Sequence, residues 1–203
     1  MEQALDLYAR ALAKQPNNAE LLNNVGSWYF ATGDQREAES LWNRAVAAAP
    51  DYPSPLNNLA GLAITQSRPA DAEALLRRAL ALDANYGDAR INMALVLRAT
   101  GRADEARAEL RRAVEDPRAT ARALPQLGFF ELEAGYVDSA IEALTRASTL
   151  TPRNVQIWNG LGEAYRLKGR MSQAAEAWRH SLGLNPNQPQ IAGALEALLS
   201  THP

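Results

Sequence analysis

A 34-residue period runs through the chain and limits what it can fold into. In residues 19–52, Gly26 and Ala38 are small, Trp42 is bulky and Pro50 closes the unit. Steps of 34 from Gly26 and from Ala38 reach only small residues: Ala60, Ala94, Gly128 and Gly162 in the first series, and Ala72, Ala106, Ala140 and Ala174 in the second. Because one such unit cannot bury its apolar face alone, we expect the units to stack on one another.

This pattern of bulky and small residues resembles the tetratricopeptide repeat. The unit at residues 155–188 carries the signature most fully, in Trp158, Leu161, Gly162, Tyr165, Ala174, Trp178 and Pro186. The resemblance implies an all-α fold, a right-handed α-solenoid (superhelix) of stacked antiparallel helix pairs. It also implies a non-catalytic scaffold for protein–protein interaction, which binds a peptide or an extended protein segment in its concave groove.

The period divides residues 1–203 into one continuous solenoid. A half repeat at 1–18 precedes full repeats at 19–52, 53–86, 87–120, 121–154 and 155–188, and 189–203 reads as a C-terminal capping helix. The half repeat lacks its first helix, so we expect Met1 to begin a segment cut from a longer protein. The alternative is a natural lone helix that acts as an N-terminal cap.

Glycine and proline predict where the helices begin and end. In the first full repeat we expect helices near residues 19–32 and 35–48, separated by a turn at Gly33. Ser67 takes the place of this turn glycine in the next repeat. Because Pro125 is best tolerated in the first turn of a helix, we expect the helix around it to begin late, near Leu124.

Composition excludes several classes of protein. The net charge is −2 and the isoelectric point is about 5.8, which gives no electrostatic case for nucleic acid. There is no cysteine, no phosphate-binding or nucleophile motif and no apolar run of about 18 residues. We therefore expect no catalytic, metal or cofactor site and no direct membrane insertion. The excess of arginine over lysine and the abundance of alanine suggest a bacterial source, while the compartment, cytoplasmic or periplasmic, stays open.

Five aromatic residues occupy places in the repeat that are expected to be buried. These are Trp42, Trp158, Trp178, Tyr29 and Tyr165. Trp28 differs, because it faces the half repeat, and we expect Trp28 and Val25 to be incompletely covered. A second copy, giving a homodimer through the N-terminal end, or an upstream segment of a longer protein would cover them. We expect His180 to lie on the exposed surface.

In the family, the second, fifth, sixth, ninth and twelfth residues of each repeat line the groove. The resemblance thus places the candidate peptide-binding residues at Asn23, Asn24, Asn57, Asn58, Asn92, Phe129, Asn159, Arg98, Arg122 and Arg166. The asparagine series resembles the ladder in the superhelix of O-linked GlcNAc transferases. An amide both donates and accepts hydrogen bonds, as a peptide backbone requires. Two interpretations stay open: these asparagines bind a peptide backbone, or they only satisfy local polar groups. We expect Asn24, Asn58 and Asn92 to face water.

A carboxylate clamp of the kind that binds chaperone tails is not expected in this groove. The places that would form the clamp hold Asn23, Ser27, Asn58, Asp88 and Asn92, and only Asn58 is of the residue type that the clamp requires. Arginines concentrate from residue 98 to residue 122, where acids such as Glu105 and Glu109 favour an ion-paired, solvated helix face. The alternative is that Arg90, Arg98 and Arg122 converge on the groove and bind a carboxylate.

The alternative to a peptide-binding scaffold is a regulatory or oligomerising tail cut from a larger, envelope-associated enzyme.

Overall fold

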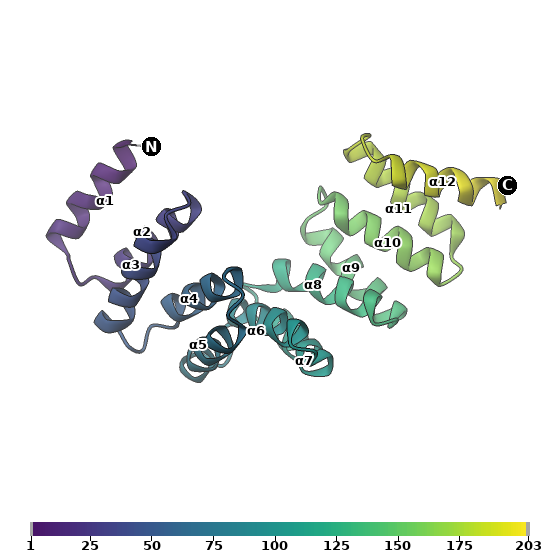
Figure 1. Ribbon diagram of the computed structural model, residues 1–203. Helices are drawn as coiled ribbons and strands as arrows, with labels where there is room; N and C mark the ends of the chain where they lie inside the picture. Colours follow the sequence, from purple (N-terminus) through teal and green to yellow (C-terminus); the bar gives the residue numbers. More distant parts are fainter. Residues whose placement is uncertain (1, 202–203) are drawn as a thin grey trace. The chain divides into compact units, whose positions relative to one another are not determined.

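The computed structural model describes residues 2–201, and the side chains of residues 7–200 (Figure 1). Among these residues it contains helices and no strand. The helices are α1 (Glu2–Lys14), α2 (Ala19–Ala31), α3 (Gln35–Ala48), α4 (Pro53–Thr65), α5 (Pro69–Leu82), α6 (Gly87–Ala99), α7 (Ala103–Glu115), α8 (Thr120–Glu133), α9 (Val137–Leu150), α10 (Val155–Leu167), α11 (Met171–Leu184) and α12 (Pro189–Thr201). The expected all-α class is confirmed.

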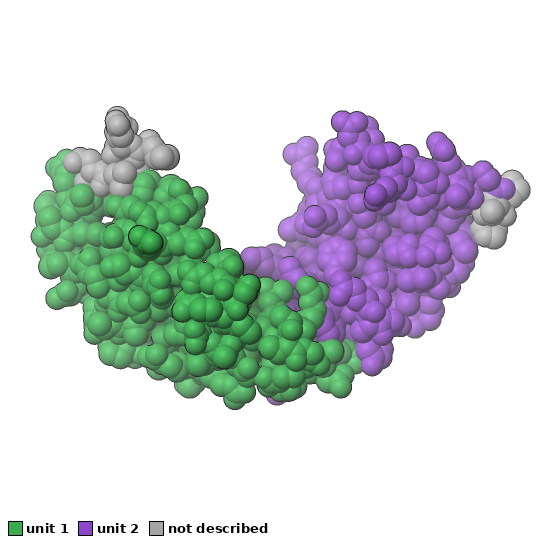
Figure 2. Space-filling model, viewed as in Figure 1, with its two compact units in different colours: residues 1–109 green, residues 110–203 purple. Residues whose placement is uncertain are grey.

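The chain forms two compact units, residues 1–109 and residues 110–203 (Figure 2). In the first unit α2 packs on α3 and α4 packs on α5, while α3 contacts α4 and α5 contacts α6. In the second unit α8 pairs with α9 and α10 with α11, and α9 contacts α10. Each unit is therefore a stack of helix pairs, as expected for a helical solenoid. That the two units form one continuous domain stays a prediction.

Close contact between the two helices of a repeat explains why the eighth residue of each repeat is small. A Cβ atom built on Gly26 would lie 2.8 Å from Cδ1 of Trp42, and one built on Gly162 would lie 2.2 Å from Nε1 of Trp178. Any side chain at these glycines would displace the indole ring that fills the space between the helices. The same contact, between a glycine of the first helix and a tryptophan of the second, thus occurs in both the first and the last full repeat.

The expected burial of the aromatic residues is confirmed in part. Trp42 and Trp178 are each 2% exposed. Trp158, Tyr29 and Tyr165 are half-buried and pack against the edges of buried clusters. His180 is exposed as expected, and its ring lies 4.1 Å from that of Trp158, centroid to centroid.

The two buried tryptophans differ in hydrogen bonding. Nε1 of Trp42 donates to the backbone carbonyl of Asn23 at 3.1 Å. Among the described residues, Nε1 of Trp178 is the buried side-chain nitrogen or oxygen that has no partner. A buried donor without an acceptor is costly, so the indole of Trp178 lacks a stabilising hydrogen bond that the indole of Trp42 makes.

The turn between the two helices of a repeat requires a left-handed backbone. Gly33, Gly101, Gly135 and Gly169 have φ angles of 96°, 79°, 80° and 75°. Ser67 occupies the same position with φ of 57°. A residue with a Cβ atom is strained in this conformation, so Ser67 adopts the turn because the stacked repeat imposes it.

The expected start of α8 near Leu124 is wrong, because α8 begins at Thr120 and holds Pro125 inside it. The backbone N–H and the hydroxyl of Thr120 both donate to the carbonyl of Asp116, at 2.9 and 2.8 Å. These bonds start the helix before the proline is reached. Pro125 removes one helical hydrogen bond, whose acceptor would be Ala121, and because Ala121 is exposed its carbonyl can bind water instead.

The two ends differ in coverage. At the N-terminal end Trp28 is half-buried, as expected, and its ring contacts those of Tyr8 and Tyr29 at centroid distances of 6.0 and 5.1 Å. The expected exposure of Val25 is wrong: this residue is buried in a cluster that Tyr8 and Leu12 of α1 cover. At the C-terminal end α12 packs one apolar face, including Leu195 and Leu198, against the cluster around Trp178. The predicted final helix is therefore confirmed.

The substitution Ser67→Gly should stabilise the protein. Relief of the left-handed strain outweighs the added freedom of the unfolded chain, and we expect a gain of about 0.5–1 kcal/mol. The matched change Gly33→Ser should destabilise it, because it introduces the same strain at the equivalent turn. Thermal and urea unfolding would measure both, and a loss of stability in Ser67→Gly would contradict the interpretation.

Replacing the two buried tryptophans by phenylalanine should have unequal effects. Both changes remove similar apolar volume, but only Trp42→Phe removes a hydrogen bond. We expect Trp42→Phe to cost about 0.5–1.5 kcal/mol more than Trp178→Phe. Urea denaturation of the two variants side by side is the measurement, and equal losses would show that the bond from Trp42 to Asn23 contributes nothing.

Candidate protein-binding surface

Asparagines line one face of the first helices in the first unit. They occupy the fifth and sixth places of α2 and α4 and the sixth place of α6. Asn23 and Asn57, at the fifth place, are 7% and 8% exposed, so their side chains are buried between repeats. Asn58 and Asn92, at the sixth place, are half-buried, and Asn24 is exposed. The fold thus places the predicted asparagines of this unit on one surface, which we call the amide stripe.

The amide stripe is connected by hydrogen bonds from repeat to repeat. Nδ2 of Asn58 donates to Oδ1 of Asn23 at 2.8 Å, and Nδ2 of Asn92 donates to Oδ1 of Asn57 at 2.9 Å. Each bond joins residues 35 positions apart, one more than the period. A comparison at steps of 34 residues does not reveal these pairs, because each pair joins the fifth residue of one repeat to the sixth residue of the next.

The stripe is also tied to the core of the first repeat. The backbone carbonyl of Asn23 accepts hydrogen bonds from Nε1 of Trp42 and from the hydroxyl of Ser27, at 3.1 and 3.0 Å. The hydroxyl oxygen of Ser27 also lies 3.3 Å from Nδ2 of Asn58. The side chains of this stripe are therefore held in fixed positions before any ligand arrives.

The expectation that three of the asparagines face water holds only for Asn24. It is wrong for Asn58 and Asn92, because each is half-buried and donates to the preceding repeat. Within the part of the chain that the structure describes, the side-chain carbonyls of Asn58 and Asn92 accept no hydrogen bond, and the amide nitrogen of Asn24 donates none. The side-chain nitrogen of Asn57 also donates none within the described residues, and these four groups keep unused hydrogen-bonding capacity on the stripe.

In the second unit the predicted residues are more fully engaged. Asn159 donates to Oε1 of Gln188 at 2.8 Å and accepts from the hydroxyl of Ser181, so both ends of its amide are used. Phe129 is half-buried against α10, where a Cβ atom on Gly160 would lie 2.6 Å from its ring. Sequence reasoning did not assign a role to Gln188, which also donates to the backbone carbonyls of residues 181 and 185.

The predicted groove arginines of this unit are exposed. Arg122 lies in the first turn of α8, and Arg166 lies in the last turn of α10. Arg166 forms two hydrogen bonds with the carboxylate of Glu163, at 2.6 and 2.8 Å. These bonds hold the pKa of Glu163 below its ordinary value and raise the pKa of Arg166. A ligand carboxylate at Arg166 would therefore compete with Glu163.

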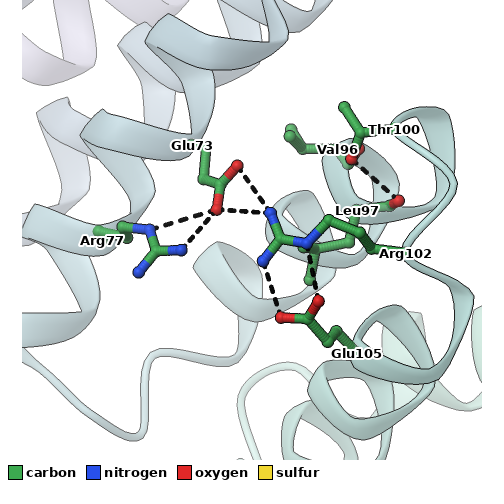
Figure 3. A network of polar contacts seen from close by, with 7 residues as sticks. All are labelled: Glu73, Arg77, Val96, Leu97, Thr100, Arg102 and Glu105. Carbon is green, nitrogen blue, oxygen red and sulfur yellow. Dashed lines mark hydrogen bonds and ion pairs between the residues drawn. The ribbon is translucent and has the colours of Figure 1, made fainter.

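The basic segment of the first unit forms ion pairs between helices, as Figure 3 shows. Arg102 binds Glu105 of α7 at 2.7 Å and Glu73 of α5 at 2.8 Å. Glu73 also accepts from Arg77 at 2.6 Å. Hydrogen bonds from Arg102, and secondly from Arg77, lower the pKa of Glu73, and Arg102 likewise lowers the pKa of Glu105. The predicted ion-paired face is confirmed here, although one of its acids comes from another repeat.

Two further arginines, Arg90 in the first unit and Arg111 in the second, also have acidic partners. Arg90 pairs with Glu109 and donates to the backbone carbonyl of residue 84, so its guanidinium is already engaged inside the first unit. Exposed Arg111 pairs at 3.1 Å with Glu131, which is only 1% exposed. Glu131 stands where two other repeats have Tyr29 and Tyr165, and the sequence did not reveal its burial. Arg98 is exposed near the end of α6. We find no support for Arg90 as a carboxylate-binding residue.

The described residues were also searched for a metal-binding cluster and for a membrane-spanning helix. No cluster of three or more histidine, cysteine, aspartate or glutamate side chains suited to a metal ion occurs among the described residues. No helix in the described part of the chain is both long and apolar enough to cross a membrane.

Comparison with known families gives a consistent result. One sequence profile described as tetratricopeptide repeat matches residues 2–53 and 131–189, which is more than half of the chain. A second profile of the same description matches residues 63–124. A search of curated proteins finds no match.

Three of the solved structures with similar folds differ in how much of each chain is matched. YrrB, described as a TPR protein with an unusual peptide-binding site, has a TM-score of 0.68 and 17% identity, and covers 93% of this chain and 97% of its own. A chain of the APC/C hetero-tetramer Cut9–Hcn1 has a TM-score of 0.81 and 16% identity over 98% of this chain and 39% of that chain. PilF of Pseudomonas aeruginosa has a TM-score of 0.65 and 28% identity over 75% and 69%.

The lowered pKa of Glu73 predicts a pH-dependent contribution to stability. A carboxylate whose pKa is lower in the folded state stabilises the fold above its unfolded pKa, about 4.3, and loses this effect as the pH falls through its folded pKa. Glu73→Gln should therefore lower the urea midpoint at pH 7, and the difference from the wild type should disappear in acid. Glu176→Gln on α11 is the control. A difference that persists below about pH 2 would show that packing, not charge, is responsible.

Proposed function

Because the chain belongs to the tetratricopeptide repeat family, whose members are generally non-catalytic scaffolds that bind proteins, we propose that it binds an extended peptide segment along the first helices of its repeats. The amide stripe is the centre of the proposed site. Its asparagines hold one another in place, and their remaining carbonyl and amide groups pair with the backbone of the ligand.

The observation that carries the proposal is the pair of side-chain carbonyls on Asn58 and Asn92. They repeat once per helix pair, and hydrogen bonds to Asn23 and Asn57 fix their orientation. A fixed acceptor loses little conformational entropy when a ligand binds, which favours affinity. Both interpretations of the asparagines then apply together: one end of each amide serves the fold and the other is offered to the peptide.

The expected ligand is defined by its backbone rather than by its side chains. Each hydrogen bond to a backbone N–H or carbonyl contributes about 0.5–1.5 kcal/mol net, so affinity should be modest and sequence preference broad. The half-buried rings of Phe30 and Phe129 would add apolar contacts. Arg98, Arg122 and Arg166 would favour a segment that carries carboxylates. Asn159 would support the site from within the fold, because both ends of its amide are already used.

The likeness to YrrB agrees with peptide binding but does not carry the proposal. At 17% identity that likeness concerns the fold alone. The amides of this chain carry the proposal, and mutation of their residues can test it.

The test is affinity measured on a ligand selected from an unbiased peptide display library against the full chain. Asn24→Ala and Arg166→Ala should each weaken binding. Asn24→Ala should do so without lowering thermal stability, since its side chain is exposed, whereas Arg166→Ala also removes the ion pair with Glu163. The loss at Asn24 should be about twofold to tenfold, the equivalent of one hydrogen bond. Asn58→Ala should weaken binding and also destabilise the fold by about 0.5–1.5 kcal/mol, because it breaks the bond to Asn23.

Matched controls on the second helices separate this surface from the rest. Asn43→Ala on α3 and Arg146→Ala on α9 remove exposed side chains of the same types and should leave the affinity unchanged. If the controls weaken binding as much as Asn24→Ala and Arg166→Ala do, the ligand binds the second helices and the proposed site is wrong.

A further inference from the structure

The unused acceptors of the amide stripe recur with a fixed spacing. Oδ1 of Asn58 on α4 and Oδ1 of Asn92 on α6 occupy the sixth place of successive repeats and accept no hydrogen bond within the described residues. α4 contacts α6 directly, as α2 contacts α4. Packed helices lie about 8–10 Å apart, axis to axis, so equivalent groups on neighbouring first helices are separated by about that distance. A ligand that uses both acceptors must match this spacing.

The spacing distinguishes among the regular conformations of a peptide. In a β-strand, the N–H groups on one edge recur every second residue, about 6.6–6.8 Å apart, which is too short. An α-helix uses its N–H groups internally. In a polyproline II helix, every third residue has the same orientation, about 9.3 Å further along, and no backbone group is used internally. Among these conformations, polyproline II is the one that offers one equivalent N–H group to each repeat.

Apolar side chains stand on the same face of the first helices. Phe30 and Ile64, at the twelfth place of α2 and α4, and Leu95, at the ninth place of α6, are half-buried and keep part of their surface in water. A Cβ atom on Gly61, at the ninth place of α4, would meet nothing within 4 Å. This face thus combines apolar side chains with open room at Gly61. Proline-rich segments bind in apolar grooves lined by aromatic side chains.

We infer that the extended ligand of the proposed function is a proline-rich segment in the polyproline II conformation, bound by the first unit. This inference rests on the proposed function, because it uses the same asparagines. One residue in three would be other than proline, since proline has no N–H group, and these N–H groups would donate to Asn58 and Asn92. A carbonyl of the segment would accept from Nδ2 of Asn24. The intervening prolines would pack on the apolar side chains of the face.

A proline-rich segment compensates for the small number of hydrogen bonds. Each bond to the stripe changes the affinity by only about twofold to tenfold. A polyproline II segment is largely formed before it binds, so it loses less conformational entropy than a flexible chain does. The asparagines are likewise held in place before binding, by the bonds between repeats. Both partners are therefore preorganised for the contact.

The probe is a peptide of four Pro-Pro-Ser triplets, titrated into the full chain while the side-chain amide signals of the asparagines are followed by NMR. A permuted peptide has the same composition with its serines adjacent, and an all-proline peptide of the same length has no N–H group to donate. The triplet peptide should bind and shift the signal of Asn24. The permuted peptide should bind about twofold to tenfold more weakly, and the all-proline peptide more weakly still.

A double-mutant cycle tests the bond to Asn92. Asn92→Ala should weaken binding of the triplet peptide but leave binding of the all-proline peptide unchanged, because the latter makes no hydrogen bond there. Asn24→Ala should weaken binding of both peptides, since both carry carbonyl groups. The control Asn43→Ala, an exposed asparagine of α3, should affect neither. If Asn92→Ala does not fold, the comparison of the three peptides on the wild type still tests the spacing.

Three results would overturn the inference: no binding of the triplet peptide, equal binding of all three peptides, or binding that Asn24→Ala leaves unchanged. The display peptide separates these failures from that of the proposed function. If the display peptide loses affinity on Asn24→Ala while the triplet peptide does not bind, the stripe binds an extended segment that is not polyproline II. If the display peptide is also insensitive to Asn24→Ala, the proposed function is wrong as well.

Discussion

The fold depends on one repeated contact between a small residue of the first helix and a large residue of the second. Where that small residue is Gly26, Gly128 or Gly162, the facing side chain is Trp42, Leu144 or Trp178. The facing side chain lies so close that no Cβ atom fits, and this closeness fixes the distance between the helices. Alanine, which is nearly as small, takes this place in the other two full repeats. The first helices therefore present corresponding faces, and each place on that face recurs once per repeat.

The amide stripe is the consequence for function. A buried amide must find hydrogen-bond partners, and in this chain the asparagines satisfy one another between repeats. Structural and binding roles are therefore not alternatives at these positions. In the proposed function, the same side chain that joins two repeats would also offer a carbonyl to a ligand, so a change at Asn58 would affect stability and affinity together, whereas a change at the exposed Asn24 would affect affinity alone.

Much of this could be predicted from the sequence, because the period is a property of local packing. The helices, their turns and the burial of Trp42 and Trp178 followed from the spacing of small, bulky and turn residues. The features that were not predicted depend on interactions that a 34-residue period does not encode. The start of α8 depends on bonds from Thr120 to Asp116, the burial of Glu131 depends on Arg111, and the asparagine pairs bridge a spacing of 35. Each depends on partners that only the folded chain brings together.

The hydrogen bonds of the amide stripe all run the same way. In both pairs the later repeat donates and the earlier repeat accepts, so the row of amides has a polarity along the array. A peptide backbone also has a polarity, from its amino to its carboxyl end. The two directions in which a bound segment could lie along the stripe are therefore not equivalent, and under the proposed function the asparagines would discriminate chain direction even where they do not select side chains.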